Sequence, residues 1–150
     1  MADQTQSWRT GVNKTGLPNS TGDFLGFTHH GDRTRRGYFK LGRKTAATTF
    51  RQKAKDLNDG RRRIRNAQPR TEWWKTLRAK VVGHYRYYGV SGNYRSLRQY
   101  DRLAHKLAYK WLNRRSQRKS FTYAKYQRFL EFNPLPLPRI YHSTYTLSPV

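Results

Sequence analysis

The sequence predicts a mainly α protein, in which a short N-terminal β-hairpin precedes a bundle of three or four helices and an extended, proline-rich C-terminal tail. Three observations support this fold class. Short apolar runs separated by turn-forming residues occupy positions 23–44, as in a hairpin. From position 45 to about 130, apolar residues recur every three or four positions, as on one face of a helix. Prolines alternate with leucines at 134–138, and proline cannot donate the hydrogen bond that a helix interior needs.

The domain boundaries follow changes in composition. Residues 1–22 are rich in Ser, Thr, Asn and Gly without apolar periodicity, which predicts a flexible leader. Within 23–44, the apolar runs at 24–27 and 38–41 predict two short strands joined by a basic loop. Residues 45–145 form the predicted helical domain, and 146–150 a frayed tail.

The helix boundaries are marked by capping and breaking residues. The first helix is expected to begin at about Thr45, to be interrupted at Gly60 and to end before Pro69. Thr71 is placed to cap a second helix, because a threonine hydroxyl accepts hydrogen bonds from free amides of the first turn. Gly89 stands where that second helix would end.

A third helix is predicted from about 94 to 113, with Asn93 as its N-cap, and Ser120 is placed to cap a fourth. We expect the tail to pack across the bundle through Ile140 and Tyr141. The side chains expected to pack the bundle are Trp74, Leu77, Val81, Leu97, Leu107, Trp111 and Phe129.

The composition points to a polyanionic partner. Thirty-two Lys and Arg face eight Asp and Glu, so the net charge is +24, and a compact chain with this charge repels itself unless a polyanion neutralises it. Nucleic acid is the first candidate, because backbone phosphates form a dense line of negative charge. Aromatic residues make up 15% of the chain, too many for a solvated polyelectrolyte. Since RNA-binding domains also stack bases on aromatic rings, RNA is the expected partner.

A membrane surface is the competing partner for a basic chain. No apolar stretch approaches the roughly eighteen residues of a membrane-spanning helix, and residues 1–18 lack the apolar segment of a secretory signal. The absence of cysteine fits a reducing interior. We therefore expect a cytoplasmic protein without membrane contact.

A line of cations is the most informative pattern in the helical region. Successive members lie four residues apart, and each such step overshoots a helical turn by about 40°, so they wind slowly beside the apolar face. No acidic residue occurs between Asp101 and Glu131, whereas an ordinary solvated helix gains stability from oppositely charged pairs. The pattern predicts a track for RNA phosphates. The members of this basic line are Arg102, Lys106, Lys110, Arg114 and Arg118.

Further cations lie upstream of the basic line and around its end. Arg outnumbers Lys among them, which suits bidentate contacts with phosphate. If about six to eight phosphates are neutralised, log K should fall against log salt with a slope of about −4 to −7. The nucleic-acid-binding residues expected outside the basic line are Arg35, Arg36, Lys40, Arg43, Lys44, Arg51, Arg61, Arg62, Arg63, Arg78, Arg95, Arg98, Arg115 and Lys119.

An aromatic cluster occupies residues 84–89. Tyr85 and Tyr88 continue the apolar stripe of the second helix and are expected in the core. His84, Arg86 and Tyr87 fall off that stripe and are candidates for RNA contact. His84 could equally be a surface or hydrogen-bonded histidine that does not contact RNA.

No arrangement of residues in the sequence indicates catalysis. The acidic residues are scattered, without a close pair suited to two-metal or acid–base chemistry. His29 and His30 are adjacent rather than four residues apart, as helical metal ligands would be. A glycine-rich phosphate-binding loop is also missing from the sequence. We expect this chain to have no enzymatic activity alone, no cofactor and no metal.

Four sequence blocks, in this order, resemble the C-terminal part of bacterial group II intron reverse transcriptase/maturases. The resemblance spans about residues 23–145. The blocks are Asp23-Phe-Leu-Gly-Phe-Thr28, His84-Tyr-Arg-Tyr-Tyr-Gly89, Lys110-Trp-Leu-Asn-Arg-Arg-Ser-Gln117 and Pro134-Leu-Pro-Leu-Pro-Arg-Ile-Tyr-His142.

The resemblance implies a thumb-like helical domain. In that family the first block closes the palm near the primer grip, and the following helices form the thumb, also called the maturase or X domain. By resemblance, residues 93–118 and the loop through Lys119 are where intron RNA or a template–primer duplex would be contacted. The family's polymerase core, with its aromatic-Ala-Asp-Asp metal motif, would precede Asp23 and is not in this sequence, and no Cys/His endonuclease module follows. The resemblance therefore implies RNA binding without polymerase activity, by a cytoplasmic protein of bacterial type within a ribonucleoprotein.

The expected function is binding of structured RNA, foremost a group II intron RNA, to assist its folding and splicing. Two alternatives stay open. The chain could be a split thumb subunit of a reverse transcriptase, clamping template–primer for a separate polymerase core. It could also be a general RNA-packing protein, like a basic ribosomal protein.

Overall fold

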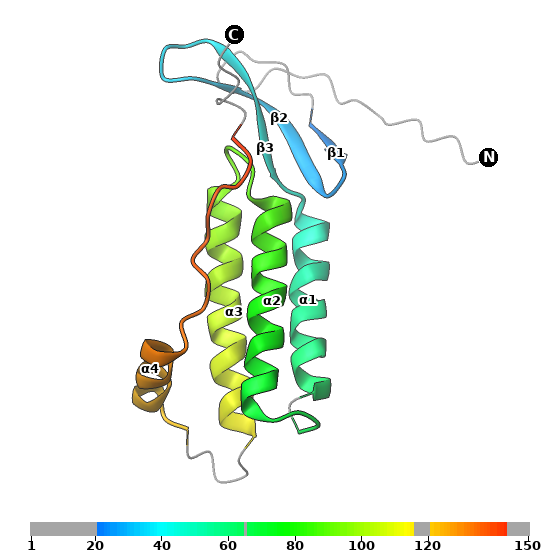
Figure 1. Cartoon of the computed structure of the whole chain (residues 1–150). Helices are drawn as coiled ribbons and strands as arrows, with labels where there is room; N and C mark the ends of the chain where they lie inside the picture. The colour runs from blue at the N-terminus through cyan, green and yellow to red at the C-terminus, as the bar shows by residue number, and fades with distance from the viewer. Residues whose placement is uncertain (1–20, 65, 116–120, 144–150) are drawn as a thin grey trace, which may run out of the picture. The chain divides into compact units, whose positions relative to one another are not determined.

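The computed structural model describes residues 21–64, 66–115 and 121–143. Three strands are followed by four helices, so the chain is mainly α with an N-terminal sheet, as predicted (Figure 1). The chain divides into two compact units, Met1–Phe50 and Arg51–Val150. The predicted frayed tail and all but the last two residues of the predicted leader lie outside the described residues.

The N-terminal unit contains a three-stranded antiparallel sheet where a two-stranded hairpin was predicted. The run at 24–27, predicted as a strand, bends back on itself so that Phe24 pairs with Phe27. The second hairpin is longer than predicted, since its pairing extends from Arg33 opposite Phe39 to Phe27 opposite Thr45. The strands are β1 (Gly22–Phe24), β2 (Phe27–Arg33) and β3 (Phe39–Thr45), in the order β1-β2-β3.

The turn between β1 and β2 has a backbone conformation that its sequence disfavours. Leu25 and Gly26 both have positive φ angles, 51° and 82°, which makes a two-residue turn of type I′. Glycine adopts this conformation freely, whereas a side chain such as that of Leu25 costs about 1–2 kcal/mol there. The Thr28 hydroxyl donates a hydrogen bond to the Asp23 carboxylate across the hairpin, and thereby helps to hold the turn closed.

The turn between β2 and β3 carries two arginines at its tip. The Thr34 amide donates to the Tyr38 carbonyl at 2.8 Å, and the Gly37 amide donates to the Thr34 carbonyl at 2.9 Å. Gly37 has a φ of 82°, which glycine tolerates without strain. Arg35 and Arg36 lie within the turn that these hydrogen bonds close, and both side chains are exposed to solvent.

Helix α1 (Ala47–Ile64) continues through Gly60, so the predicted interruption there is wrong. A glycine in a helix interior costs only about 1 kcal/mol relative to alanine. Packing outweighs that cost, because Leu57 and Arg61 on the same face are buried.

Helix α2 (Arg70–Tyr88) begins after Pro69, whose missing amide hydrogen is not needed at a helix start. Thr71 lies inside the first turn and no side chain makes a capping hydrogen bond, so its predicted capping role is wrong. Glu72 lies in that turn, where a carboxylate is favoured by the helix dipole, and it also pairs with Lys75 at 2.9 Å.

Helix α3 (Tyr94–Arg114) confirms the predicted third helix to within one residue. Asn93 occupies the N-cap position, as predicted, but its side chain makes no capping bond. Its fully buried amide instead donates to the Tyr88 carbonyl at 2.8 Å. The asparagine therefore ties the end of α2 to the start of α3.

The core of the helical unit lies around α2. Six of the seven predicted core side chains are buried, and the seventh, Phe129, is half-buried and meets Trp74 edge-on at 4.8 Å between ring centroids. Trp73, which was not predicted to pack the bundle, is fully buried against Arg61 of α1. Adjacent tryptophans on α2 therefore pack against different neighbouring helices.

Helix α4 (Tyr123–Phe132) is capped by Thr122, whose hydroxyl accepts a hydrogen bond from the Lys125 amide at 3.4 Å. The predicted cap, Ser120, is thus two residues too early and lies outside the described residues.

After α4 the proline-rich tail is extended, as predicted, and runs back beside α3 to the loop between α2 and α3 (Figure 1). The amides of Tyr141 and His142 both donate to the Gly89 carbonyl, at 2.7 and 2.8 Å. Leu135 is buried, whereas Ile140 is half-buried and the Tyr141 side chain is exposed. The tail is therefore attached by Leu135 and by its backbone, not mainly through the Ile140 and Tyr141 side chains.

Candidate nucleic-acid interface

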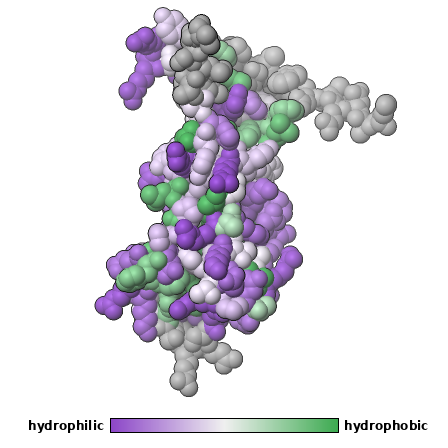
Figure 2. All heavy atoms as spheres, viewed as in Figure 1, coloured by the Kyte–Doolittle hydropathy of each residue, from purple (hydrophilic) through white to green (hydrophobic). Residues whose placement is uncertain are grey.

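Four of the five members of the basic line lie on α3, and the fifth, Arg118, lies outside the described residues. Arg102, Lys106 and Arg114 are exposed and Lys110 is half-buried. The line winds around the helix as its spacing predicted, because Lys106 lines a hollow shared with α4 whereas Lys110 and Arg114 line one shared with α1. Hydrophilic residues cover much of the visible face of the helices (Figure 2).

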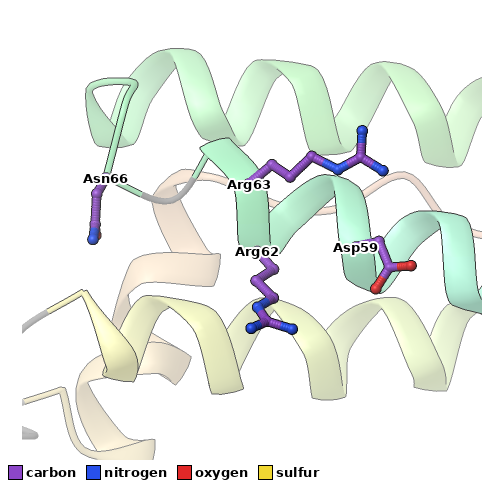
Figure 3. Close-up of a pocket in the computed structure, with 4 residues that line it drawn as sticks. All are labelled: Asp59, Arg62, Arg63 and Asn66. Atoms are coloured by element: carbon purple, nitrogen blue, oxygen red, sulfur yellow. The ribbon is translucent and has the colours of Figure 1, made fainter.

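Three cations from two helices line one hollow, which we call the α1–α3 hollow. Its volume is about 410 Å³. Arg62 reaches it from α1 and points toward α3 (Figure 3). The residues of the hollow are Asn58, Arg62, Lys110, Trp111 and Arg114.

Trp111 positions the cations of the hollow. Its ring is 4% exposed, and its Nε1 donates to the Asn58 side-chain oxygen at 3.1 Å, which joins α3 to α1. Lys110 Nζ lies 4.8 Å and Arg114 Cζ 5.4 Å from the centroid of this ring. These distances allow cation–π attraction, which holds both charges above the indole.

The cations of the hollow form no close ion pair with a carboxylate among the described residues. Among the described residues, no carboxylate oxygen lies within 4 Å of a side-chain nitrogen of Arg62, Lys110 or Arg114. Three like charges in one hollow repel each other, and a bound anion removes that repulsion. Guanidinium groups bind phosphate oxygens in a bidentate manner, so the arrangement is suited to a backbone phosphate.

A second depression, of about 500 Å³, lies at the end of α1. It is lined by Asp59, Arg62, Arg63 and Asn66. Arg62 and Arg63 point in different directions, so consecutive arginines serve different surfaces (Figure 3). Asp59 places a carboxylate in this depression, which makes it less favourable for an anion than the α1–α3 hollow.

Arg61 was predicted to bind nucleic acid, but it is 1% exposed and belongs to the core. Its Nη1 donates to the Trp73 carbonyl at 2.9 Å, and its guanidinium lies 5.5 Å from the Trp73 ring centroid. Burial lowers the pKa of this guanidinium. The error follows from the expected interruption at Gly60, since a continuous helix puts Arg61 on the buried face.

His84 was placed off the apolar stripe, but its ring is only 7% exposed. It stacks on Tyr100 at 3.5 Å between centroids with an interplanar angle of 4°. Burial, followed by the charge of Lys53, lowers its pKa from 6.5 to about 4. Because α2 packs against both α1 and α3, its buried face is wider than one stripe, and the prediction that His84 could face a ligand is wrong.

Arg115 is half-buried and has a structural hydrogen bond. Its Nη2 donates to the Gln68 carbonyl at 2.9 Å, which joins the end of α3 to the connection between α1 and α2. Burial, and then the charge of Arg70, lowers its pKa. Only part of this guanidinium is therefore open to a ligand.

The predicted cations of the sheet are spread over β3 and the preceding turn. Arg35 and Arg36 are exposed at the tip of the turn, and Lys44 is exposed on β3, whereas Arg43 is half-buried. Lys40 is paired with Asp32 at 3.1 Å. The Arg33 amide, and then Lys40, lowers the pKa of the Asp32 carboxyl.

The remaining predicted residues are exposed but do not line the α1–α3 hollow, and Lys119 lies outside the described residues. The exposed residues are Arg51, Arg78, Arg86, Tyr87, Arg95 and Arg98.

The sequence did not reveal two members of the hollow as part of the site. Asn58 was not considered, and Trp111 was expected only in the core. The signal that could have indicated Trp111 is its position on a helix between Lys110 and Arg114, adjacent to one cation and three residues from the other. No comparable signal marks Asn58, which is 53 residues away from its partner.

Comparison with family models, with curated proteins and with solved structures found no match to this chain. Within the described residues, no three His, Asp or Glu side chains come together as metal ligands would. In the same part of the chain, every helix is too short or too polar to cross a membrane.

Proposed function

We propose that this chain binds structured RNA, that its partner is a group II intron RNA, and that it assists folding and splicing of that RNA as a maturase thumb domain. The observation that carries the proposal is the α1–α3 hollow, where Arg62, Lys110 and Arg114 converge and none of them forms an ion pair within 4 Å with a carboxylate of the described residues. The net charge of +24 supports a polyanionic partner. The four sequence blocks that resemble the maturases support the choice of intron RNA.

In this proposal the hollow holds backbone phosphates. A phosphate between Arg62 and Arg114 would receive charge-assisted hydrogen bonds, while Arg102 and Lys106 would extend the contact along α3. Compact RNA brings phosphates close together, and each neutralised phosphate lowers the electrostatic cost of that folded state. The chain would act in a cytoplasmic ribonucleoprotein, without polymerase chemistry of its own.

The direct test removes the three cations of the hollow. In a variant carrying Arg62→Gln, Lys110→Gln and Arg114→Gln, affinity for a group II intron RNA should fall at least tenfold at 0.15 M salt. The slope of log K against log salt should become shallower by about 2 to 3, because each lost phosphate contact contributes about 0.9. Filter binding over a salt series measures both, and circular dichroism checks that the helices remain.

A matched control loses the same charge elsewhere. Lys53, Lys75 and Lys80 are exposed and do not line the hollow, and Lys53 lies nine residues before Arg62, on the opposite side of α1. A variant with glutamine at these three positions should keep most of the affinity. Equal losses in the two variants would mean that net charge alone governs binding, and would overturn the assignment of the hollow.

Specificity separates intron binding from general RNA packing. Unrelated structured RNA of the same length should compete poorly at moderate salt, and the chain should speed splicing of the intron at low magnesium. Equal competition without effect on splicing would contradict the maturase role and favour a packing protein. Co-purification with a polymerase core would instead favour the split-thumb alternative.

A further inference from the structure

A second hollow lies between α3 and α4 and shares one residue, Lys106, with the proposed phosphate contacts. Its volume is about 530 Å³, within the range of roughly 300–1,000 Å³ typical of small-molecule sites. We call it the aromatic pocket, because three tyrosine rings line it. Its main lining residues are His105, Lys106, Tyr109, Tyr123, Tyr126 and Gln127.

The floor of the aromatic pocket is fixed by hydrogen bonds. Tyr126 is 2% exposed, and its hydroxyl lies 3.0 Å from His105 Nδ1. His105 Nε2 lies 3.7 Å from the Asp101 carboxylate, which also accepts a hydrogen bond from the Tyr85 hydroxyl at 3.0 Å. The Tyr126 hydroxyl also donates to the His105 carbonyl oxygen at 3.3 Å, so the ring and the backbone of His105 together hold Tyr126 in place. Burial raises the pKa of Tyr126, which keeps the hydroxyl neutral.

The three tyrosine rings of the pocket are inclined to one another rather than stacked in parallel. Tyr109 lies 5.7 Å from Tyr123 at an interplanar angle of 86°, and 5.5 Å from Tyr126 at 48°. Tyr123 and Tyr126 are 6.3 Å apart at 46°. No two of these rings are parallel, so none of the three is stacked face to face on another, and Tyr123 meets Tyr109 in an edge-to-face arrangement. Tyr123 is 60% exposed and forms the accessible wall of the pocket.

The charge at the pocket is positive. Lys106, a member of the basic line, is exposed at its edge, and no carboxylate lines it among the described residues. Gln127 supplies an amide that both donates and accepts hydrogen bonds. Lys106 also lies four residues before Lys110 of the α1–α3 hollow, a rise of about 6 Å along α3. One RNA strand could therefore reach both sites.

We propose that the aromatic pocket takes an unpaired RNA base, which stacks on Tyr123 while its phosphate is held by Lys106. A ligand that is both planar and anionic matches the rings and the charge together, and an unpaired nucleotide has both properties. This inference rests on the proposed function, because it assumes that RNA is bound along α3. A base bound in the aromatic pocket would make the chain prefer RNA with an unpaired base over fully paired RNA, and the phosphate contacts alone would not give this preference.

Two RNA hairpins test the pocket, one with a single bulged 2-aminopurine and one fully paired with the same fluorophore. The wild-type chain should bind the bulged hairpin about 5- to 150-fold more tightly, the range expected for stacking of one base, and should quench its fluorescence. Tyr123→Leu, at an exposed position in the first turn of α4, should reduce this preference to less than twofold and leave affinity for the paired hairpin unchanged. Tyr123→Phe keeps the ring and should preserve the preference.

The outcomes separate this inference from the proposed function. Equal binding of both hairpins by the wild type, or an unchanged preference in Tyr123→Leu, would overturn the base pocket while leaving RNA binding intact. Tyr123-dependent binding of free adenosine monophosphate without preference for the bulge would mean a mononucleotide site and would also overturn it. Failure to bind either hairpin, or the group II intron RNA, would overturn both proposals.

Discussion

His84 illustrates how a single polar residue becomes part of the core. Its ring is stacked on Tyr100, and its Nε2 is buried without a hydrogen-bond partner among the described residues. A charged imidazole would be strongly disfavoured in this position, and its pKa is accordingly lowered to about 4. Folding therefore selects the neutral form of His84.

The lowered pKa predicts a pH-dependent stability. Between pH 6.5 and 4 the unfolded chain binds a proton at His84 that the folded chain does not, so the free energy of unfolding falls as the pH falls through this window. The loss is about 3 kcal/mol at pH 4, from 1.36 kcal/mol per pKa unit. His84→Phe keeps an aromatic ring against Tyr100 and should remove this contribution in urea unfolding measured from pH 7 to 4. The same substitution at His29 of the sheet is the control, and an unchanged pH dependence in His84→Phe would contradict the prediction.

At the scale of elements, the tail and the loop between α2 and α3 depend on each other. Besides the two hydrogen bonds to the Gly89 carbonyl, the Ser91 amide donates to the His142 carbonyl at 3.0 Å. Gly89 has a φ of −76°, so its backbone conformation does not require glycine. The lack of space at this position does require glycine, because a Cβ there would lie 2.3 Å from the Tyr85 carbonyl oxygen and 2.7 Å from the Arg139 carbonyl oxygen.

Gly89→Ala should therefore displace the tail. We expect a loss of about 2 kcal/mol in the free energy of unfolding, as is typical of overpacking, and faster trypsin cleavage after the exposed Arg139. Gly83→Ala is the matched control on the same helix, since a Cβ there has no neighbour within 4 Å. It should stabilise the chain by about 0.5–1 kcal/mol through helix propensity alone. Wild-type stability and wild-type cleavage in Gly89→Ala would show that the tail does not depend on this contact.

At the scale of the whole molecule, charge opposes folding and favours RNA. The chain carries 32 Lys and Arg but only eight Asp and Glu, so cations far outnumber the carboxylates that could neutralise them. Salt screens this repulsion, because the Debye length shortens from about 10 Å at 0.1 M to about 3 Å at 1 M. The same screening weakens contacts with phosphate.

Salt should consequently have opposite effects on folding and on binding. Raising sodium chloride from 0.1 to 1 M should increase the thermal unfolding midpoint by about 5 °C. RNA affinity should fall with a slope of about −4 to −7 in log–log form. Sodium sulfate at equal ionic strength should raise the midpoint further, and more in the wild type than in the Arg62, Lys110 and Arg114 triple variant. A flat midpoint in chloride would contradict the role of self-repulsion, and equal sulfate effects would contradict anion binding in the hollow.

Much of the fold was predictable because it depends on local pattern. The fold class, the bounds of α3, six core residues and the winding of the basic line follow from periodicity within single segments. The predictions of helix breaks and caps that were wrong each depended on the preference of a single residue. Gly60 did not interrupt α1, and Thr71 did not cap α2, because packing of the whole helix outweighs the weak preference of one residue.

The sequence by itself determined that this protein is mainly helical, strongly basic and rich in aromatic residues. Only the tertiary structure decided that Arg61 lies inside while Arg62 faces α3, and that Lys106 and Lys110 line different hollows. The physical reason is that periodicity assigns a residue to a face of its own helix, whereas the neighbour on that face is set by contacts between distant segments. The hydrogen bond from Trp111 to Asn58 joins residues 53 positions apart, and no local pattern records such a pair.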